Sequence, residues 1–251
     1  MNYGRFSALL AAVAAMAIAN QASAAVIDDF SSDSSGDYIQ SLVLDQNATG
    51  DTVLDIAGGV ARVTKSAGTE AEQNVFLRSD YGIAVGETLR VDVNVPAVGG
   101  NQDFGIAIAT TDDPADAVWT SGTADARQGI LYSYVKAGSG QVRTDGYDAA
   151  TGAGLGNFSA DVDVTTVTGL YITRTGPLMF DAGYTTASGD ALINSYLVDS
   201  ADFGSAVGFY SDMRAVATLG EFDNLRVVPE PSTLLLAGLG LAGLAVARRR
   251  K

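Results

Sequence analysis

Polar and apolar residues alternate with a period of two along most of the chain between residues 25 and 228. The alternation is clearest in Leu89–Val95, Phe104–Ala109 and Leu170–Arg174. Successive side chains of a strand point to opposite faces of a sheet, so this pattern predicts strands with one buried face. Only Thr69–Asn74 and Asp113–Ala117 are compatible with a helical turn. The pattern therefore predicts an all-β domain.

Glycine-rich turn signals separate the alternating runs at four places. Two runs joined by such a short turn are typical of a β-hairpin. We therefore predict one domain over residues 25–228, with about 12 to 14 short strands in two antiparallel sheets. The four turns are Ala57-Gly58-Gly59, Ala137-Gly138-Ser139-Gly140, Thr175-Gly176-Pro177 and Ser188-Gly189-Asp190.

The N-terminal residues have the pattern of a secretory signal peptide. Arg5 gives a positive start, Ala8 to Ala19 form an apolar stretch, and Ala22-Ser23-Ala24 has the small residues that signal peptidase requires. We predict that residues 1–24 are removed, with cleavage after Ala24 or, as the alternative, after Ala25. A transmembrane helix is the other interpretation, but the apolar stretch is short and polar residues follow it.

The C-terminal residues combine three physically distinct parts. Pro229-Glu230-Pro231 keeps the backbone extended and removes two backbone donors. An uncharged run from Thr233 to Ala247 follows, and Arg248, Arg249, Arg250 and Lys251 end the chain. The positive-inside rule keeps such a cationic end in the cytoplasm, so the apolar run is predicted to be a single transmembrane helix. A permanent membrane anchor is the alternative, although a comfortable span needs about 20 apolar residues.

Residues 229–251 resemble the PEP-CTERM tail, the tripartite sorting signal that bacterial exosortases recognise and process. Pro229, Glu230 and Pro231 stand where that family has its motif. The resemblance implies an exported protein of a Gram-negative bacterium that is held in the inner membrane transiently through its C-terminal helix. After an exosortase has processed the tail, the body is expected at the cell surface, in the outer membrane or in the extracellular matrix.

The body is strongly acidic. The whole chain has 29 acidic and 15 basic residues. Arg5, the four C-terminal cations and Glu230 belong to the two signals, which leaves 28 acidic against 10 basic residues and a net charge near −18. Nucleic acid is therefore not an expected partner, because phosphate binding needs a basic surface.

The chain contains no cysteine and no histidine. Their absence excludes disulfides, thiolate chemistry, His-ligated zinc and every catalytic triad that uses imidazole as its base. Carboxylate, hydroxyl, lysine and tyrosine chemistry remain. The stability of this exported domain must come from packing or from a metal.

Several segments of the body resemble the concanavalin A-like (laminin G-like) jelly roll. The segments Gly169–Gly176 and Met179–Tyr184 are similar to one of its hairpins, and Ala206–Ser211 and Gly220–Val227 are similar to its last two strands. Ile27-Asp28-Asp29-Phe30 is typical of its first strand, which lies beside the last. The resemblance implies a two-sheet sandwich with those neighbours.

Glycoside hydrolases on this jelly roll use two carboxylates on one strand face, about 5 Å apart. Asp161-Val162-Asp163 and Glu70-Ala71-Glu72 are the candidate pairs, because alternation would place both carboxylates of a pair on one face. Neither pair has the tryptophan-rich surroundings of the family's enzymes, and Trp119 is the single tryptophan. Solvated acidic faces are the alternative, and we predict no catalytic residue.

Calcium is the cofactor for which the sequence leaves room. Several jelly rolls hold a structural Ca²⁺ where the first and last strands meet, using carboxylate and backbone oxygens. Asp28 or Asp29 and Asp223 would converge there, and Asp29 with Asp223 is the predicted pair. Solvent-exposed aspartates are the alternative.

Carbohydrate binding is the remaining chemistry, because lectin sites stack an aromatic ring on a sugar and bind its hydroxyls with Asp and Asn. Trp119, Tyr132 and Tyr134 are the candidates, with Tyr147 nearby. Tyr132 and Tyr134 share one strand face, so both line a site or both face the core or solvent.

These observations favour a non-enzymatic surface or biofilm-matrix protein that binds extracellular polysaccharide. A glycoside hydrolase or lyase on the same scaffold is the competing interpretation. Signal peptidase, an exosortase and an exopolysaccharide are the expected partners.

Overall fold

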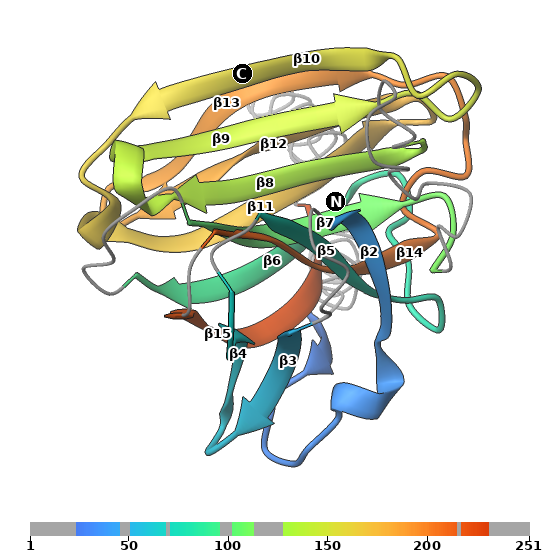
Figure 1. Cartoon of the computed structure of the whole chain (residues 1–251). Coiled ribbons are helices and arrows are strands. Elements are labelled where there is room, and N and C mark those ends of the chain that lie inside the picture. Colours follow the sequence, from blue (N-terminus) through green and yellow to red (C-terminus); the bar gives the residue numbers. More distant parts are fainter. Residues whose placement is uncertain are drawn as a thin grey trace, which may run out of the picture.

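The computed structural model describes residues 24–45, 51–68, 71–95, 102–112, 128–214 and 217–230. These residues form an eight-stranded and a seven-stranded antiparallel sheet, packed face to face (Figure 1). The predicted all-β sandwich is confirmed, and no helix within the described ranges is long and apolar enough to cross a membrane. Three short 3₁₀ helices are η1 (Ser35–Asp37), η3 (Ala137–Ser139) and η4 (Val164–Thr166). The strands are β1 (Ala25–Asp28), β2 (Ile39–Asp45), β3 (Thr52–Ala57), β4 (Val60–Lys65), β5 (Glu72–Arg78), β6 (Glu87–Asn94), β7 (Asp103–Ala109), β8 (Ile130–Lys136), β9 (Gln141–Tyr147), β10 (Gly154–Asp161), β11 (Val167–Gly176), β12 (Met179–Thr186), β13 (Gly189–Leu197), β14 (Ala206–Met213) and β15 (Ala217–Pro229).

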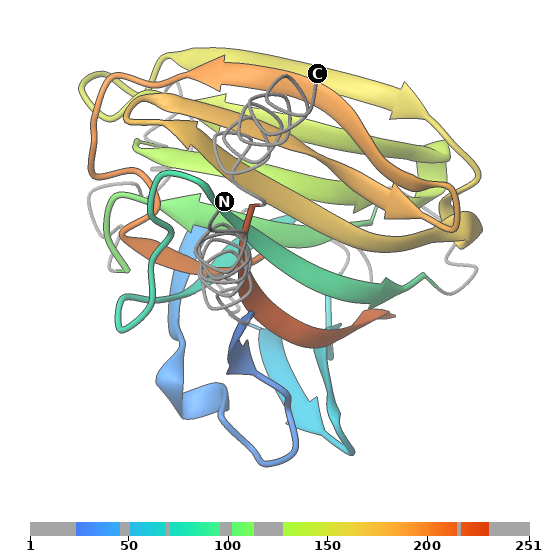
Figure 2. The ribbon, with the colours of Figure 1, turned by 180° about the vertical axis from the view of Figure 1, so that it is seen from behind.

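Sheet A has the strand order β13-β12-β11-β6-β15-β4-β3 and faces the viewer in Figure 2. Sheet B has the order β10-β9-β8-β7-β14-β5-β2 and faces the viewer in Figure 1. The four predicted glycine-rich turns all join neighbouring strands. Gly58 and Gly59, for example, have φ values of +66° and +84°, which L side chains rarely adopt, so the β3–β4 turn needs glycine.

The first strand lies beside the last, as the jelly-roll resemblance implies. Ala25 pairs with Val227 and Asp28 with Leu225 in an antiparallel ladder. The N-terminal half of β15 pairs with β4 instead, where Phe222 lies opposite Ala61. The long strand β15 therefore ties both ends of the domain to the centre of sheet A.

Aromatic residues from both sheets meet in the core. The ring of Phe209 on β14 stacks 4.7 Å from that of Phe222 on β15, and Phe104 on β7 meets Phe222 edge-on at 5.6 Å. Phe30 follows β1 and lies 6.0 Å from Phe209. This packing holds the two sheets and the N-terminal segment together, since buried aromatic surface dominates core energetics.

Two buried hydroxyl groups connect the sheets across the core. Ser133 on β8 donates to the backbone oxygen of Gly183 on β12 at 2.8 Å, and Tyr196 on β13 donates to Thr144 on β9 at 2.7 Å. Burying a polar group without a partner is costly, so these bonds fix the relative position of the sheets.

The helix-compatible interpretation of Thr69–Asn74 is wrong for its last three residues, because Glu72–Arg78 form strand β5. Glu72 is fully buried and pairs with Lys65 on β4 of the other sheet, a contact between sheets that periodicity along one segment does not contain. The other helix-compatible segment, Asp113–Ala117, lies outside the described residues.

Candidate functional site

The outer face of sheet B, opposite the core, carries three polar and aromatic rows. Residues of each row lie in register across the strands β5, β14, β7, β8, β9 and β10. The rows are Gln73, Asp212, Asp103, Lys136, Gln141 and Asp161; Val75, Tyr210, Gly105, Tyr134, Arg143 and Ser159; and Leu77, Gly208, Ala107, Tyr132, Asp145 and Asn157. Strand alternation thus places all these side chains on one face.

Three tyrosines form the centre of this face. The ring of Tyr210 lies 4.3 Å from that of Tyr132 and 5.2 Å from that of Tyr134. Gly105 stands between Tyr210 and Tyr134, and a Cβ there would lie 2.5 Å from the Cα of Tyr134, so the position requires glycine. All three rings are buried in a cluster separate from the core between the sheets. The prediction that Tyr132 and Tyr134 share a face is confirmed, and that face is the outer one.

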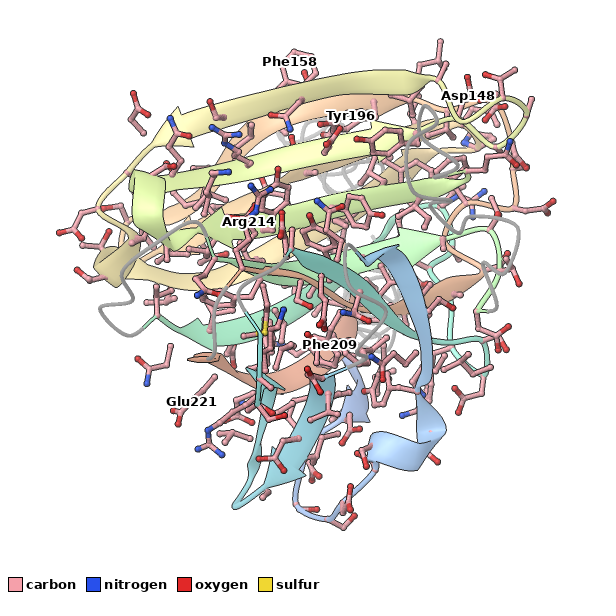
Figure 3. All side chains as sticks on the ribbon, viewed as in Figure 1. Asp148, Phe158, Tyr196, Phe209, Arg214 and Glu221 are labelled. Atoms are coloured by element: carbon pink, nitrogen blue, oxygen red, sulfur yellow. The ribbon has the colours of Figure 1, made fainter. Side chains whose placement is uncertain are left out.

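Beside the tyrosines, β9 and β10 present six polar residues that we call the polar shelf. Its β10 members are exposed, and those on β9 are buried or half-buried. The exposed edge of β10 also carries Phe158, whose ring packs edge-on against Tyr196 at 6.0 Å (Figure 3). The polar shelf consists of Gln141, Arg143, Asp145, Asn157, Ser159 and Asp161.

One end of the polar shelf is organised around the carboxylate of Asp145. Asp145 accepts hydrogen bonds from the side chains of Tyr147 and Asn157, both at 3.2 Å, and Asn157 also donates to the hydroxyl of Tyr134 at 3.4 Å. Burial raises the pKa of Tyr134 to about 12, so its hydroxyl keeps its proton at physiological pH. Carboxylate, amide and phenol groups therefore meet here, with the amide of Asn157 exposed and Asp145, Tyr134 and Tyr147 buried beside it.

The other end of the polar shelf holds a second set of planar groups. The guanidinium of Arg143 donates to Gln141 at 2.9 and 2.7 Å, and the amide of Gln141 donates to Asp161 at 2.7 Å. These contacts fix the orientation of the groups before any ligand arrives, which lowers the entropic cost of binding.

A pair of buried aspartates lies on the same outer face, in the row next to Tyr210 and Tyr134. Asp103 and Asp212 stand directly opposite each other on β7 and β14, with 4% and 2% of their surfaces exposed. Arg214 lies in front of sheet B and binds Asp212 at 2.8 Å, whereas the nearest cation to Asp103 is Lys136 at 3.7 Å (Figure 3). Burial, followed by repulsion from Asp212, raises the pKa of Asp103 to about 7.

Of the two candidate carboxylate pairs, only Asp161 with Asp163 lies wholly within the described residues. Asp161 ends β10, but Asp163 caps η4 by accepting from the backbone of Thr165, so the two do not share a strand face. Glu72 is fully buried beside Lys65 at 3.1 Å, and Glu70 lies outside the described residues. Sequence spacing therefore did not identify the carboxylates that come together.

The predicted calcium ligands lie near the β1–β15 junction. Asp29 is exposed and accepts from the backbone of Ser31 at 3.0 Å, whereas Asp28 is buried and accepts from Tyr38 at 3.1 Å. Asp223 lies opposite Asp92 of β6 in the strand register. In the part of the chain that the structure describes, no group of three acidic side chains is arranged to hold a metal. Calcium at this junction stays a prediction.

The sorting motif begins inside the folded body rather than after it. Pro229 is the last residue of β15 and lies opposite Glu87 on β6. The backbone N–H of Glu230 donates to Gly86 at 2.7 Å, and its carboxylate accepts from the hydroxyl of Thr88. Glu230 therefore contacts the folded body, and β15 continues past Val228, the predicted end of the domain.

Some predicted features lie outside the described residues. They include Trp119, the signal peptide before Ala24, the run Thr233–Ala247, and the set Pro231, Arg248, Arg249, Arg250 and Lys251.

The residues that the sequence reasoning missed are Asp103, Asp145, Asn157 and Asp212. They lie on four strands, and only the pairing of those strands brings them together. The available signal was alternation, which places Asp145 with Tyr147 and Tyr210 with Asp212 on common faces.

The chain is similar in structure to several solved proteins. A prokaryotic β-1,3-1,4-glucanase (lichenase) derived from a mouse hindgut metagenome is 10% identical, with a TM-score of 0.50 over 81% of this chain and 97% of the other. LamAcat from Zobellia galactanivorans is 8% identical, with a TM-score of 0.51 over 81% and 97%. A legume lectin-like domain from Entamoeba histolytica is 7% identical, with a TM-score of 0.49 over 76% and 88%. The likenesses to the lichenase and to LamAcat show the jelly-roll fold alone.

No curated protein matches the chain. The family described as the PEP-CTERM protein-sorting motif matches residues 227–251, which include Pro229, Glu230 and the cationic end. The motif implies processing by an exosortase and a destination at the surface. The chain is thus a jelly-roll body that carries a PEP-CTERM sorting motif at its C-terminus.

Proposed function

We propose that this protein is exported, processed at its tail, and binds an extracellular polysaccharide through the polar shelf without cleaving it. The observation that carries the proposal is the meeting of the exposed amide of Asn157 with the buried carboxylate of Asp145, which also accepts from Tyr147, and with the buried hydroxyl of Tyr134. Sugar hydroxyls both donate and accept, so a carboxylate beside an amide suits them.

The shape of the polar shelf supports an extended ligand rather than a single small molecule. Its three cross-strand pairs, Gln141 with Asp161, Arg143 with Ser159 and Asp145 with Asn157, succeed one another along β9 and β10. Alternate residues of a strand are about 7 Å apart. Each pair offers at least one planar polar or hydroxyl group, from Gln141 and Asp161 at one end to Asp145 and Asn157 at the other. A polysaccharide lying along the strands would therefore contact about one such group per sugar unit.

Glycoside hydrolysis is the competing function, and Asp103 with Asp212 is the observation that favours it. Retaining glycosidases place two carboxyl groups about 5 Å apart, and opposite residues in a sheet have a similar Cβ separation. One carboxyl with a pKa of about 7 also suits a general acid. Both side chains are buried, however, and Asp212 is bound by Arg214 and Gln73, so neither carboxylate is exposed to a ligand among the described residues.

The body with its tail processed is then expected in the outer membrane, at the cell surface or in a biofilm matrix rich in exopolysaccharide. Signal peptidase would act at the N-terminus and an exosortase at the tail, with the C-terminal helix holding the protein in the inner membrane in between. A net charge near −18 favours a neutral glycan over an acidic one, because like charges repel at low salt.

A glycan array read in parallel with a reducing-sugar assay tests this proposal. The protein should bind one class of polysaccharide and release no product, and Asn157→Ala should weaken that binding. Thr168→Ala is the matched control, because Thr168 is exposed on β11 of the other sheet. Product release that Asp103→Asn abolishes would favour the hydrolase instead.

A further inference from the structure

We infer that the body has a binding site on sheet A for its own sorting motif, and that docking there competes with processing of the tail. The inference rests on the proposed function in one respect, since it assumes that the motif is read by a sorting enzyme. Its ligand is an extended peptide in which a glutamate follows a proline, here Pro229 and Glu230.

The backbone of the motif extends the sheet. The pairing of β15 with β6 continues through Val228 opposite Thr88 and Pro229 opposite Glu87. The N–H of Glu230 then donates to Gly86 at 2.7 Å. Proline cannot donate and ends many ladders, so this bond beyond Pro229 shows that the strand continues into the motif.

The turn before β6 aims its carbonyl group at the motif. Gly86 has a φ of +86°, a conformation that favours glycine. Its own N–H donates to Arg174 on β11 at 2.7 Å, and Glu87 closes the turn by donating to Ala84 at 3.1 Å. The acceptor for Glu230 is therefore held in place by contacts that do not involve the tail.

The glutamate side chain enters a polar site on the outer face of sheet A. Its carboxylate accepts from the hydroxyl of Thr88, which is fully buried and also shares a hydrogen bond of 2.7 Å with Thr173. The guanidinium of Arg90 lies 3.7 Å from the same carboxylate oxygen. A donor and a cation together make the site selective for a carboxylate.

Arg90 is positioned by groups other than the motif. Asp190 on β13 binds its guanidinium at 3.0 and 2.6 Å, and the ring of Tyr171 lies 5.2 Å away. The site is therefore built before the motif arrives, so docking loses little side-chain freedom.

Docking hides the features that a sorting enzyme would read. The side chain of Glu230 remains 37% exposed, but its carboxylate and backbone N–H are engaged by the body. An enzyme that binds the motif as an extended peptide needs these same groups. Processing therefore requires the last residues of β15 to detach from β6 first.

Hydrogen–deuterium exchange on the full chain in detergent micelles tests the docking without any processing. Pro229 and Pro231 have no amide hydrogen, so Glu230 supplies the sole amide signal between them. We expect Glu230 to be protected, and Thr88→Val to speed its exchange about tenfold, because a hydrogen bond to a charged group is lost. Glu230→Gln, which leaves the body unchanged, should also speed exchange. Thr168→Val is the matched control and should leave it unchanged.

Pulse-chase labelling of cells tests the competition. Thr88→Val should release the tail faster than wild type and Thr168→Val. Free exchange of Glu230 in the wild type, or equal exchange in Thr88→Val and Thr168→Val, overturns the docking site. Protected Glu230 with equal processing rates overturns the competition. If replacing the whole motif by alanine does not block processing, the proposed sorting role fails, whereas the exchange result still decides the docking site.

Discussion

Asp103 and Asp212 face each other across β7 and β14 on the outer face of sheet B; Arg214 lies 2.8 Å from Asp212, whereas Lys136 lies 3.7 Å from Asp103. The two carboxylates are buried beside each other, so ionising both is unfavourable. Burial, with the charge of Asp212 next, raises the pKa of Asp103 to about 7. Asp103 therefore changes charge near neutral pH.

This relationship predicts how stability depends on pH. The folded protein holds the Asp103 proton more tightly than the unfolded chain, whose Asp pKa is near 3.8. The contribution of Asp103 to the free energy of unfolding is thus fully present below about pH 4. It falls as the pH rises to about 7, by at most about 1.4 kcal/mol per pH unit. Denaturant titrations at several pH values should show that the free energy of unfolding falls more steeply with rising pH in wild type than in Asp103→Asn. Parallel curves for the two proteins would contradict it.

The fully buried pair Lys65–Glu72 predicts a large loss of stability when one partner is removed. Glu72→Gln should lower the free energy of unfolding by about 3 to 5 kcal/mol, because Lys65 would be left charged and buried. The matched control is Glu221→Gln, which removes the half-exposed pair with Arg62 and should cost less than about 1 kcal/mol. Urea denaturation measures both. Equal losses for the two variants would show that burial of the pair is unimportant.

The strands were predictable from the sequence, but the site was not. Alternation identified β6, β7 and β11, and the turn residues identified four hairpins, because both signals are local. Tyr132 and Tyr134 were placed on one face, but sheet B is buried on both faces, so alternation did not say which. Asn157, which donates to Asp145, and Thr88, which donates to Glu230, come from other strands, and no local pattern contains these contacts.

Calcium at the β1–β15 junction remains a prediction, and melting curves test it. If Asp29 and Asp223 bind Ca²⁺ in the folded state only, a chelator should lower the melting temperature, since such a ligand stabilises by mass action. Asp29→Asn should remove that difference. An unchanged melting temperature between chelator and millimolar calcium would leave both aspartates as solvated surface groups.

Replacing Pro229-Glu230-Pro231 by three alanines predicts a block in sorting. Removal of the signal peptide and folding of the body should stay intact, since the core lies upstream of Pro229. The full-length protein should accumulate in the inner membrane, because the sorting enzyme has lost the side chains it reads. Fractionation of cells with a tagged body measures this. Equal amounts of tail-free body at the surface in both strains would mean that the motif is not read.

The most direct test of polysaccharide binding is calorimetric titration of the body with the best glycan from the array, comparing wild type with Asn157→Ala. The side-chain amide of Asn157 donates to Asp145 and Tyr134. Because Asn157 is exposed, its replacement by alanine should leave the melting temperature nearly unchanged. We predict about tenfold weaker binding, equivalent to the loss of one or two hydrogen bonds. Equal affinity for wild type and Asn157→Ala, with binding intact, would place the glycan elsewhere and contradict the role of the polar shelf.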